Sequence, residues 1–382
     1  MGILSQRTPP KKRRERSIFG SIFNALMLVV LVEVLLLVAS IYLMQVGPQL
    51  NQNAEDILAM QVETRSGYIQ SQLNDAQELS SLTSRINTLT QELLDSGAID
   101  LATLDSSSDA AYPLLAAVTP KLISTLRSKP VTGIYLILNT HDLNERANGD
   151  RLPSVYLRDL DPDSPPPENN SDLMFERAPA RLVQTQNIAT DKAWKPALTY
   201  RSLGAGGLVC SSFQTAYDAE TKLDATAYGH WTTSPYVING DDRQAIAYSL
   251  PLILPDGTVY GVVGVELLTS YLTEKLPYNE LHTSNSGSYA LCYSDTTLHA
   301  DTLTAFPVMN SGGPDLSTAL QLTRRDTDCF RFSKNNFSYT ASLVPLEVYS
   351  RNAPFYGEHW CLVGIVPSSA LFAFAQRVQQ LL

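Results

Sequence analysis

Residues 244–267 read QAIAYSLPLILPDGTVYGVVGVEL. Two apolar runs flank the turn Pro255-Asp256-Gly257, where glycine supplies the positive φ that a tight connection needs. The stretch therefore predicts a β-hairpin of Gln244–Leu254 and Thr258–Leu267. Similar short runs predict further strands, mostly antiparallel, at Val131–Leu138, Ser154–Leu160, Ser288–Tyr293, Cys329–Phe332, Ser338–Pro345 and His359–Val366.

Helices are predicted before these strands. The segment from Asn51 to Ser96 has no proline, and its apolar residues at a three-four spacing predict one long helix; they are Leu79, Leu82, Ile86, Leu89 and Leu93. This seam fits packing on the chain's own domain slightly better than a homodimer contact. A second helix is predicted at Asp109–Leu126, with Asp109 as its N-cap. The proline-rich stretch Asp161–Asn170 predicts an exposed loop.

A near-unbroken apolar run from Ala25 to Met44 is long enough to cross a bilayer as a helix. The first 17 residues hold six Lys and Arg, so the N-terminus is expected in the cytoplasm and the bulk of the chain outside it. A cleaved signal peptide is the competing interpretation, but Val38-Ala39-Ser40 is a poor cleavage site. Glu33 falls near the bilayer midplane, where either a homodimer partner or protonation would satisfy it.

The composition excludes one class of partner. The net charge is −10, and most of the basic residues near the N-terminus precede the apolar run. The acidic remainder will not favour nucleic acid, whose phosphates need Lys and Arg. Four cysteines are too few for a disulfide scaffold. Cys329 and Cys361 are the pair to test for a disulfide, and buried free thiols are equally compatible with the sequence.

Three motifs carry a resemblance. Tyr228-Gly-His-Trp231-Thr-Thr-Ser-Pro-Tyr236, then Ala247-Tyr248-Ser-Leu-Pro-Leu252, then Asp256-Gly-Thr-Val-Tyr-Gly-Val-Val-Gly-Val-Glu266 together resemble the ligand-binding module of double Cache sensor domains. The tail, through Tyr339–Leu346 and His359–Pro367, resembles the final strands of the membrane-proximal module in that family. The likeness covers residues 49–382.

The resemblance implies an α+β fold, in which a long N-terminal transmembrane and stalk helix precedes two PAS-like antiparallel-sheet modules of about five strands each. The domains expected are a cytoplasmic basic segment (1–17), a transmembrane helix (18–46), a stalk helix with the membrane-distal Cache module (47–280), a membrane-proximal Cache module (281–368) and an exit helix (369–382). Such proteins are bacterial transmembrane receptors that sense small molecules outside the cytoplasm.

The resemblance also implies a ligand site in the distal module. Aromatic walls and one charge are expected from Trp231, Tyr236, Tyr248 and Glu266, with Tyr271 as a weaker candidate. The aromatic residues fit a sheet core equally well. Relatives that bind amino acids carry an Arg-x-Trp-Tyr group, a Tyr-x-Asp and a terminal Asp, and this chain departs from all three, with Glu266 at the last place.

An enzymatic outer domain is the rival class. The five histidines lack metal-ligand spacing, and Gly204-Ala-Gly-Gly207 lacks the Lys-Ser/Thr of a phosphate loop. No catalytic residue, metal or cofactor is therefore expected. The interpretation is a sensor with a small-molecule ligand, the membrane and a second copy as partners. The parent receptor is expected to be a histidine kinase or diguanylate cyclase, with a chemoreceptor or a surface scaffold or adhesion module as alternatives. The stop inside a predicted helix favours a fragment over a receptor half.

Overall fold

The computed structural model describes residues 18–43, 46–147, 149–200, 210–238, 240–281, 287–294, 302–309, 320–321, 323–324, 329–334, 336–373 and 375–377. The chain forms two compact units, Met1–Ala54 with Phe372–Leu382, and Glu55–Leu371. The predicted basic segment, residues 1–17, lies outside the described residues.

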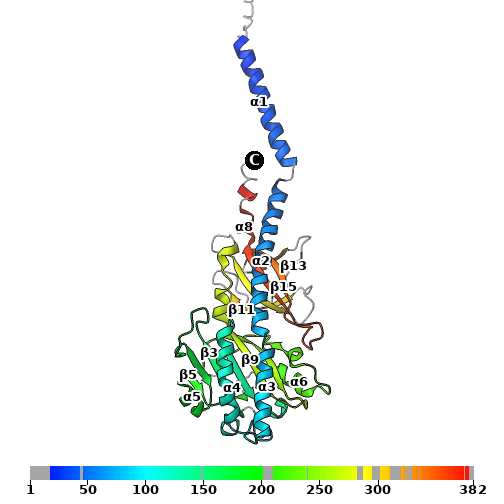
Figure 1. The fold of residues 1–382 in the computed structure, drawn as a ribbon. Helices are drawn as coiled ribbons and strands as arrows, with labels where there is room; N and C mark the ends of the chain where they lie inside the picture. Colours follow the sequence, from blue (N-terminus) through cyan, green and yellow to red (C-terminus); the bar gives the residue numbers. More distant parts are fainter. Residues whose placement is uncertain are drawn as a thin grey trace, which may run out of the picture. The chain divides into compact units, whose positions relative to one another are not determined.

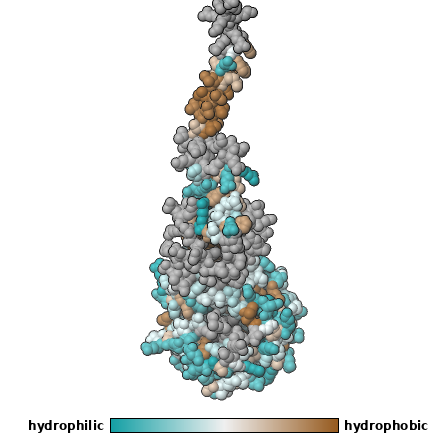
Figure 2. All heavy atoms as spheres, turned by 180° about the vertical axis from the view of Figure 1, so that it is seen from behind, coloured by the Kyte–Doolittle hydropathy of each residue, from teal (hydrophilic) through white to brown (hydrophobic). Residues whose placement is uncertain are grey.

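The first unit contains α1 (Ile18–Leu43). Within α1, Ile22–Ser40 has a mean hydropathy of 2.8 and is not buried by other parts of the protein. Its leucine, valine and phenylalanine side chains are exposed and form the brown segment in Figure 2. In the described part of the chain, α1 is the one helix long and apolar enough to span a bilayer. The apolar helix predicted from the sequence is therefore present.

The predicted long helix is interrupted. It forms α2 (Val46–Gln77) and α3 (Ser80–Asp95), separated by Glu78 and Leu79. Leu79 leaves the helical conformation with φ −114° and ψ 3°, and its side chain enters the core. The seam packs on the chain's own domain, because Leu79, Leu82 and Ile86 are buried there.

The helix α4 (Ser108–Ser128) follows, one residue longer at its start than predicted. Its N-cap is Ser107, whose hydroxyl accepts a hydrogen bond from the Ala110 amide. Asp109 lies in the first turn instead, so the predicted cap was wrong by two residues. A carboxylate in the first turn still interacts favourably with the helix dipole.

The first sheet has seven strands in the order β5-β4-β3-β1-β9-β8-β7. All neighbours are antiparallel except β4 and β5. The predicted hairpin around Pro255-Asp256-Gly257 is confirmed, with Gly257 at φ 89° in its turn. The strands are β1 (Gly133–Leu138), β3 (Ser154–Asp159), β4 (Leu173–Arg177), β5 (Ala189–Lys195), β7 (His230–Trp231), β8 (Ala245–Ile253) and β9 (Val259–Leu268).

Short elements surround this sheet. A separate two-stranded ladder pairs β2 (Arg151–Leu152) with β6 (Leu198–Thr199). The helical segments are η1 (Leu143–Glu145), α5 (Ala180–Gln186), α6 (Cys210–Asp218), η3 (Ala225–Tyr228), α7 (Thr269–Glu274) and η4 (Tyr278–Leu281). The helices α3 and α4 lie side by side over the first sheet (Figure 1).

The second sheet is antiparallel, in the order β12-β11-β10-β16-β15-β14-β13. Its strands are β10 (Ser288–Ser294), β11 (Thr302–Met309), β12 (Leu320–Gln321), β13 (Thr323–Arg324), β14 (Cys329–Lys334), β15 (Phe337–Leu346) and β16 (His359–Pro367), and α8 (Ser368–Leu371) follows. Each sheet thus has more strands than the resemblance implies, because β5 and the two-residue β7 extend the first sheet at its edges and the two-residue β12 and β13 extend the second. The domain boundary at residue 280 stays a prediction.

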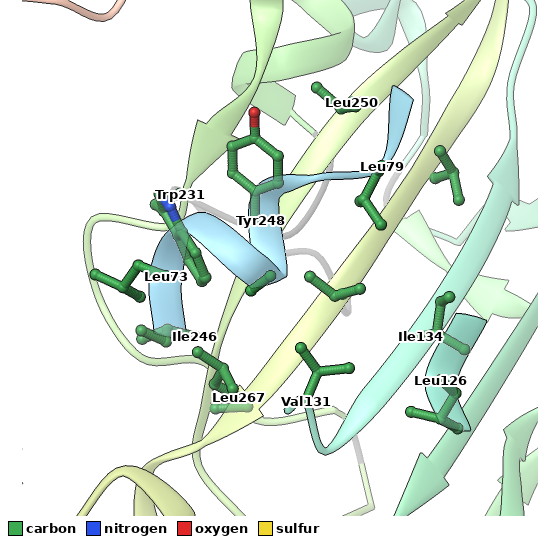
Figure 3. Packing of buried hydrophobic residues seen from close by; sticks show 14 of the residues in the cluster. Leu73, Leu79, Leu126, Val131, Ile134, Trp231, Ile246, Tyr248, Leu250 and Leu267 are labelled. Carbon is green, nitrogen blue, oxygen red and sulfur yellow. The ribbon is translucent and has the colours of Figure 1, made fainter. Parts of the chain in front are cut away.

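One apolar core runs through the second unit. It joins residues of α2, α3 and α4 to both sheets, and Figure 3 shows Leu73, Leu79, Trp231 and Tyr248 packed within it. On the second sheet, Gly364 of β16 admits Val62 of α2, since a Cβ there would lie 2.2 Å from a Val62 methyl group. The two sheets and the helix α2 therefore share buried surface.

The cysteine pair predicted for a disulfide is not brought together. Cys329 belongs to the core between α2 and the second sheet, whereas Cys361 belongs to the apolar cluster on the other face of that sheet. The prediction of a Cys329–Cys361 pair is therefore wrong, because sequence position alone does not reveal which face a strand residue occupies.

Candidate functional site

A row of residues across the first sheet places a buried ion pair on one face. Arg158 of β3 and Glu266 of β9 are both register partners of Gly133 in β1. Register partners project from the same face of a sheet, so the two long side chains meet over the glycine. A Cβ at position 133 would lie 2.9 Å from Oε1 of Glu266 and 3.1 Å from the carbonyl oxygen of Leu157. Gly133 therefore provides the space for the ion pair.

The Arg158–Glu266 contact is bidentate. Nε of Arg158 donates to Oε1 of Glu266 at 2.6 Å, and Nη2 donates to Oε2 at 2.8 Å. Both side chains are fully buried. Burial opposes the guanidinium charge, but Glu266 outweighs it and raises the pKa of Arg158. Removal of either partner would leave a buried charge without its counter-ion, which typically costs about 3–5 kcal/mol.

Two tyrosines complete the coordination of Glu266. The hydroxyl of Tyr156 donates to Oε2, and the hydroxyl of Tyr236 donates to the same oxygen at 3.1 Å. The two hydroxyls also lie 2.8 Å apart. Burial first, and then the nearby Glu266 charge, raise the pKa of Tyr156 well above its ordinary value. Tyr156 therefore remains a neutral hydrogen-bond donor to the carboxylate.

Further charged groups extend the network. Nη1 of Arg158 donates to Oε1 of Glu176 at 3.1 Å and also contacts Asp241. Arg243 contacts Glu176 at 2.9 Å, Asp191 at 2.8 Å and Asp241 at 2.9 Å. Although burial would raise the pKa of Asp241, hydrogen bonds and charge from Arg158 and then Arg243 lower it to about 2. Arg177 joins this set because its Nη1 donates to the backbone carbonyl oxygen of Glu176 at 2.5 Å. We call the set the buried charge cluster; it consists of Arg158, Glu176, Arg177, Asp191, Asp241, Arg243 and Glu266.

Glu176 is the member of the buried charge cluster whose hydrogen bonding is incomplete among the described residues. Its side chain is fully buried, and its Oε2 has no hydrogen-bond partner among the described residues. Burial raises its pKa to about 7, against the opposing effects of Arg158 and Arg243. An unpaired buried carboxylate oxygen costs free energy unless it is protonated or meets a donor. Glu176 is thus poised to accept a hydrogen bond or an ion pair.

The structure separates the predicted site residues into three places. Tyr236 contacts Glu266, a member of the buried charge cluster. Trp231 and Tyr248 are in the main core instead, with ring centroids 5.4 Å apart, and Trp231 also lies 6.0 Å from Trp360 of the second sheet. Figure 3 places both rings next to Leu73 and Leu79.

Tyr271 occupies the third place. Its hydroxyl donates to Asp163 at 3.2 Å, and the ammonium group of Lys275 lies 4.7 Å from its ring centroid. Asp163 belongs to the proline-rich loop, so Tyr271 holds that loop against α7. The contact is with the chain's own residues.

A polar contact also joins the two sheets. Nε2 of His230 in β7 lies 3.0 Å from Oε2 of Glu358, which comes just before β16. Tyr349 donates its hydroxyl proton to the same oxygen at 3.2 Å and accepts the Trp231 amide at 3.0 Å. The ring centroids of Phe355 and His230 lie 4.3 Å apart. This junction ties the edge of the first sheet to the segment between β15 and β16.

The sequence reasoning missed most of the buried charge cluster. Arg158 and Tyr156 lie within a predicted strand, and the alternation Ser154, Tyr156, Arg158 on one face was the available signal. An arginine inside such a strand must have a buried partner. Glu266 was already predicted as a charged residue of the site and was therefore a candidate for that partner. Glu176, Asp241 and Arg243 gave no local signal, because their meeting depends on sheet order.

The hollows described on the surface are lined by residues outside the buried charge cluster. The largest of the hollows described has a volume of about 670 Å³ and lies along α2; it is lined by Met60, Gln61, Thr64, Arg65, Tyr68, Asn279 and Glu280. Within the described ranges, His, Cys, Asp and Glu form no group of three or more that could hold a metal ion.

Comparison with known proteins gives distant similarities. No family model and no curated protein sequence matches the chain. The fold is similar to the periplasmic sensory domain of the Campylobacter jejuni chemoreceptor Tlp1, with 14% identity, a TM-score of 0.46, and coverage of 85% of this chain and 98% of that one. It is also similar to the extracellular domain of the putative histidine kinase soHK1S-Z6, with 15% identity, a TM-score of 0.41, and coverage of 85% and 98%.

A third similar structure is the ligand-binding domain of the Pseudomonas fluorescens chemoreceptor CtaA in complex with L-alanine. The identity is 14%, the TM-score is 0.38, and the coverage is 83% of this chain and 99% of that one. These neighbours are sensory or ligand-binding domains, the class that the sequence resemblance implies.

Proposed function

We propose that this chain is the small-molecule-sensing part of a membrane-anchored bacterial receptor, with its N-terminus in the cytoplasm and the residues after α1 outside it. The exposed apolar helix α1 and the basic residues before it support the anchor and its orientation. The acidic charge of the remainder fits a domain that meets solutes rather than nucleic acid.

The buried charge cluster supports a ligand site on the first sheet. Arg158 and Arg243 form ion pairs with four carboxylates, and Arg177 donates to the backbone carbonyl oxygen of Glu176. Four carboxylates thus outnumber three guanidinium groups, and the cluster carries an excess negative charge when Glu176 is ionised. The observation that carries the proposal is that Oε2 of Glu176 meets no hydrogen-bond donor in the part of the chain that the structure describes. A small solute with a protonated amine would supply both the missing donor and the missing positive charge. Tyr236 and Glu266 would line the same site.

Sensing would be a shift between two arrangements of the second unit. A ligand can bias such an equilibrium only by its differential affinity for the two states. The ring contact of Trp231 with Trp360 and the His230–Glu358 junction connect the first sheet to β16. In this proposal, Trp231 and Tyr248 transmit the change, and Tyr271 holds the proline-rich loop.

The test is a thermal-shift screen of the full chain in detergent against amines, amino acids, carboxylates and nucleobases. A solute present at about 100 times its Kd should stabilise the protein by about 2.7 kcal/mol. An amine that pairs with Glu176 must displace its proton, so the affinity should rise as the pH rises through about 7.

Glu176→Gln should abolish the shift caused by the amine, whereas exposed Glu220→Gln should retain it. A hit that survives Glu176→Gln would refute the assigned site. A screen without any hit would contradict the proposed sensor function and favour the alternative of a surface scaffold or adhesion module. The parent's output, whether kinase, cyclase or chemotaxis, and a homodimer through α1 are further parts of the proposal.

A further inference from the structure

Two cysteines face each other at the centre of the second sheet. Cys292 of β10 is the register partner of Cys361 of β16, between the pairs Leu291–Leu362 and Tyr293–Trp360. Directly opposite residues in an antiparallel sheet have Cα atoms about 4.5–5.5 Å apart. Disulfides span Cα separations of about 4.4–6.8 Å, so the strands need not move for a bridge to form.

The two thiols also share one environment. Cys292 and Cys361 are fully buried and belong to the same apolar cluster, with Ala290, Phe332 and Ile365 among its members. The contact with Cys292, followed by burial, raises the pKa of the Cys361 thiol. Thiols in this state react slowly once the sheet is closed, because the thiolate is the reactive species.

Cys329 does not compete for either of these partners. Cys329 packs on the opposite face, and its Sγ lies 3.7 Å from the carbonyl oxygen of Glu55. The sheet therefore pairs Cys292 with Cys361 and keeps Cys329 apart from both.

We propose that Cys292 and Cys361 form a disulfide that fixes β10 to β16. The oxidant is a disulfide-bonded exchange partner, encountered while the strands are pairing. The Cys361 thiolate attacks one sulfur of the oxidant, which breaks its S–S bond and releases one thiolate. The Cys292 thiolate then attacks the mixed disulfide, closes the bridge and releases the second thiolate. The two cysteine protons end on the two released groups, and the oxidant gains two electrons.

The bridge has a consequence for the strand that leaves the domain. β16 contacts α2 through Gly364 and runs directly into α8. A covalent link at Cys361 prevents β16 from sliding relative to β10, so movement reaching α8 must involve the sheet as a body. The oxidising environment assumed for the cell rests on the proposed outward orientation, but the pairing itself rests on strand register alone.

The test begins with the purified full chain in detergent. The protein is unfolded and reduced, refolded in a mixture of oxidised and reduced glutathione, alkylated after denaturation, digested and analysed by mass spectrometry. A peptide pair linked through Cys292 and Cys361 is expected, with a melting temperature about 5–15 °C above that of the reduced protein. Free alkylation of both residues, or a link to Cys210 or Cys329, would overturn the proposal.

Two further experiments test the cysteine pairing and the oxidising location of the chain separately. Cys329→Ser should keep the bridge, whereas Cys361→Ser should leave Cys292 open to alkylation. The wild-type measurement decides the pairing even if Cys361→Ser does not fold. Acid trapping of the chain in cells should also find the bridge. A bridge that forms in vitro but is missing from cells would refute the oxidising location while leaving the pairing established.

Discussion

Replacement of Glu176 by glutamine should change how the stability of this protein depends on pH. The pKa of the buried Glu176 is about 7 in the folded protein, against an ordinary value of 4.5. The folded state therefore holds this proton more tightly than the unfolded chain, and wild-type stability should fall as the pH rises from about 4.5 to about 7. The difference between the two pKa values corresponds to about 3 kcal/mol.

Glu176→Gln removes the ionisation and keeps an oxygen that can accept from Arg158 and Arg243. The variant should therefore gain up to about 3 kcal/mol relative to the wild type between pH 4.5 and 8. Asp241 does not interfere, because its lowered pKa of about 2 places its loss of stabilisation below pH 3.8. Contributions from groups that both proteins share cancel when the two are compared.

The measurement is urea unfolding of the wild type and the variant at pH 5, 6, 7 and 8. Exposed Glu220→Gln serves as the matched control and should show a pH-independent difference from the wild type. If the stability difference between Glu176→Gln and the wild type is the same at all four values, the carboxyl is not destabilised by burial and the reasoning fails.

Four further outcomes are expected. Gly133→Ala should cost about 1–3 kcal/mol in chemical unfolding, because its Cβ meets the ion pair, whereas Gly67→Ala has open space and should stabilise α2 by up to about 1 kcal/mol; equal effects would contradict the packing. His230→Ala should destabilise the chain by about 1–2 kcal/mol through the loss of its contact with Glu358, and an unchanged melting temperature would dismiss the junction. Protease added to spheroplasts should digest the acidic portion and spare the N-terminal segment, and protection of that portion would refute the orientation. Glu33→Cys should give crosslinked dimers in membranes, and monomers alone would remove this argument for a homodimer.

Much of the fold could be predicted because local pattern dominates it. The hairpin turn at Gly257 and the apolar strand runs gave eight strands within one or two residues of their observed bounds. Two-residue edge strands such as β7 and β12 were missed, because pairing partners rather than composition define them. The break after Gln77 was also missed, since neither glycine nor proline marks it.

The site was harder to predict because it depends on register between distant strands. Glu266 and Tyr236 were singled out, and they meet in the structure. Their main partner, Arg158, lies about a hundred residues away in sequence and is brought to Glu266 only through the shared neighbour Gly133. The same limitation explains the wrong cysteine pair, because one strand separates the strands of Cys329 and Cys361.

The apolar core shared by α2, α3, α4 and both sheets has a thermodynamic consequence. Neither sheet can open without exposing surface that stabilises the other, so the two should melt in a single cooperative transition. A solute held by the first sheet would then slow amide hydrogen exchange in β10 and β16, far from any contact with it.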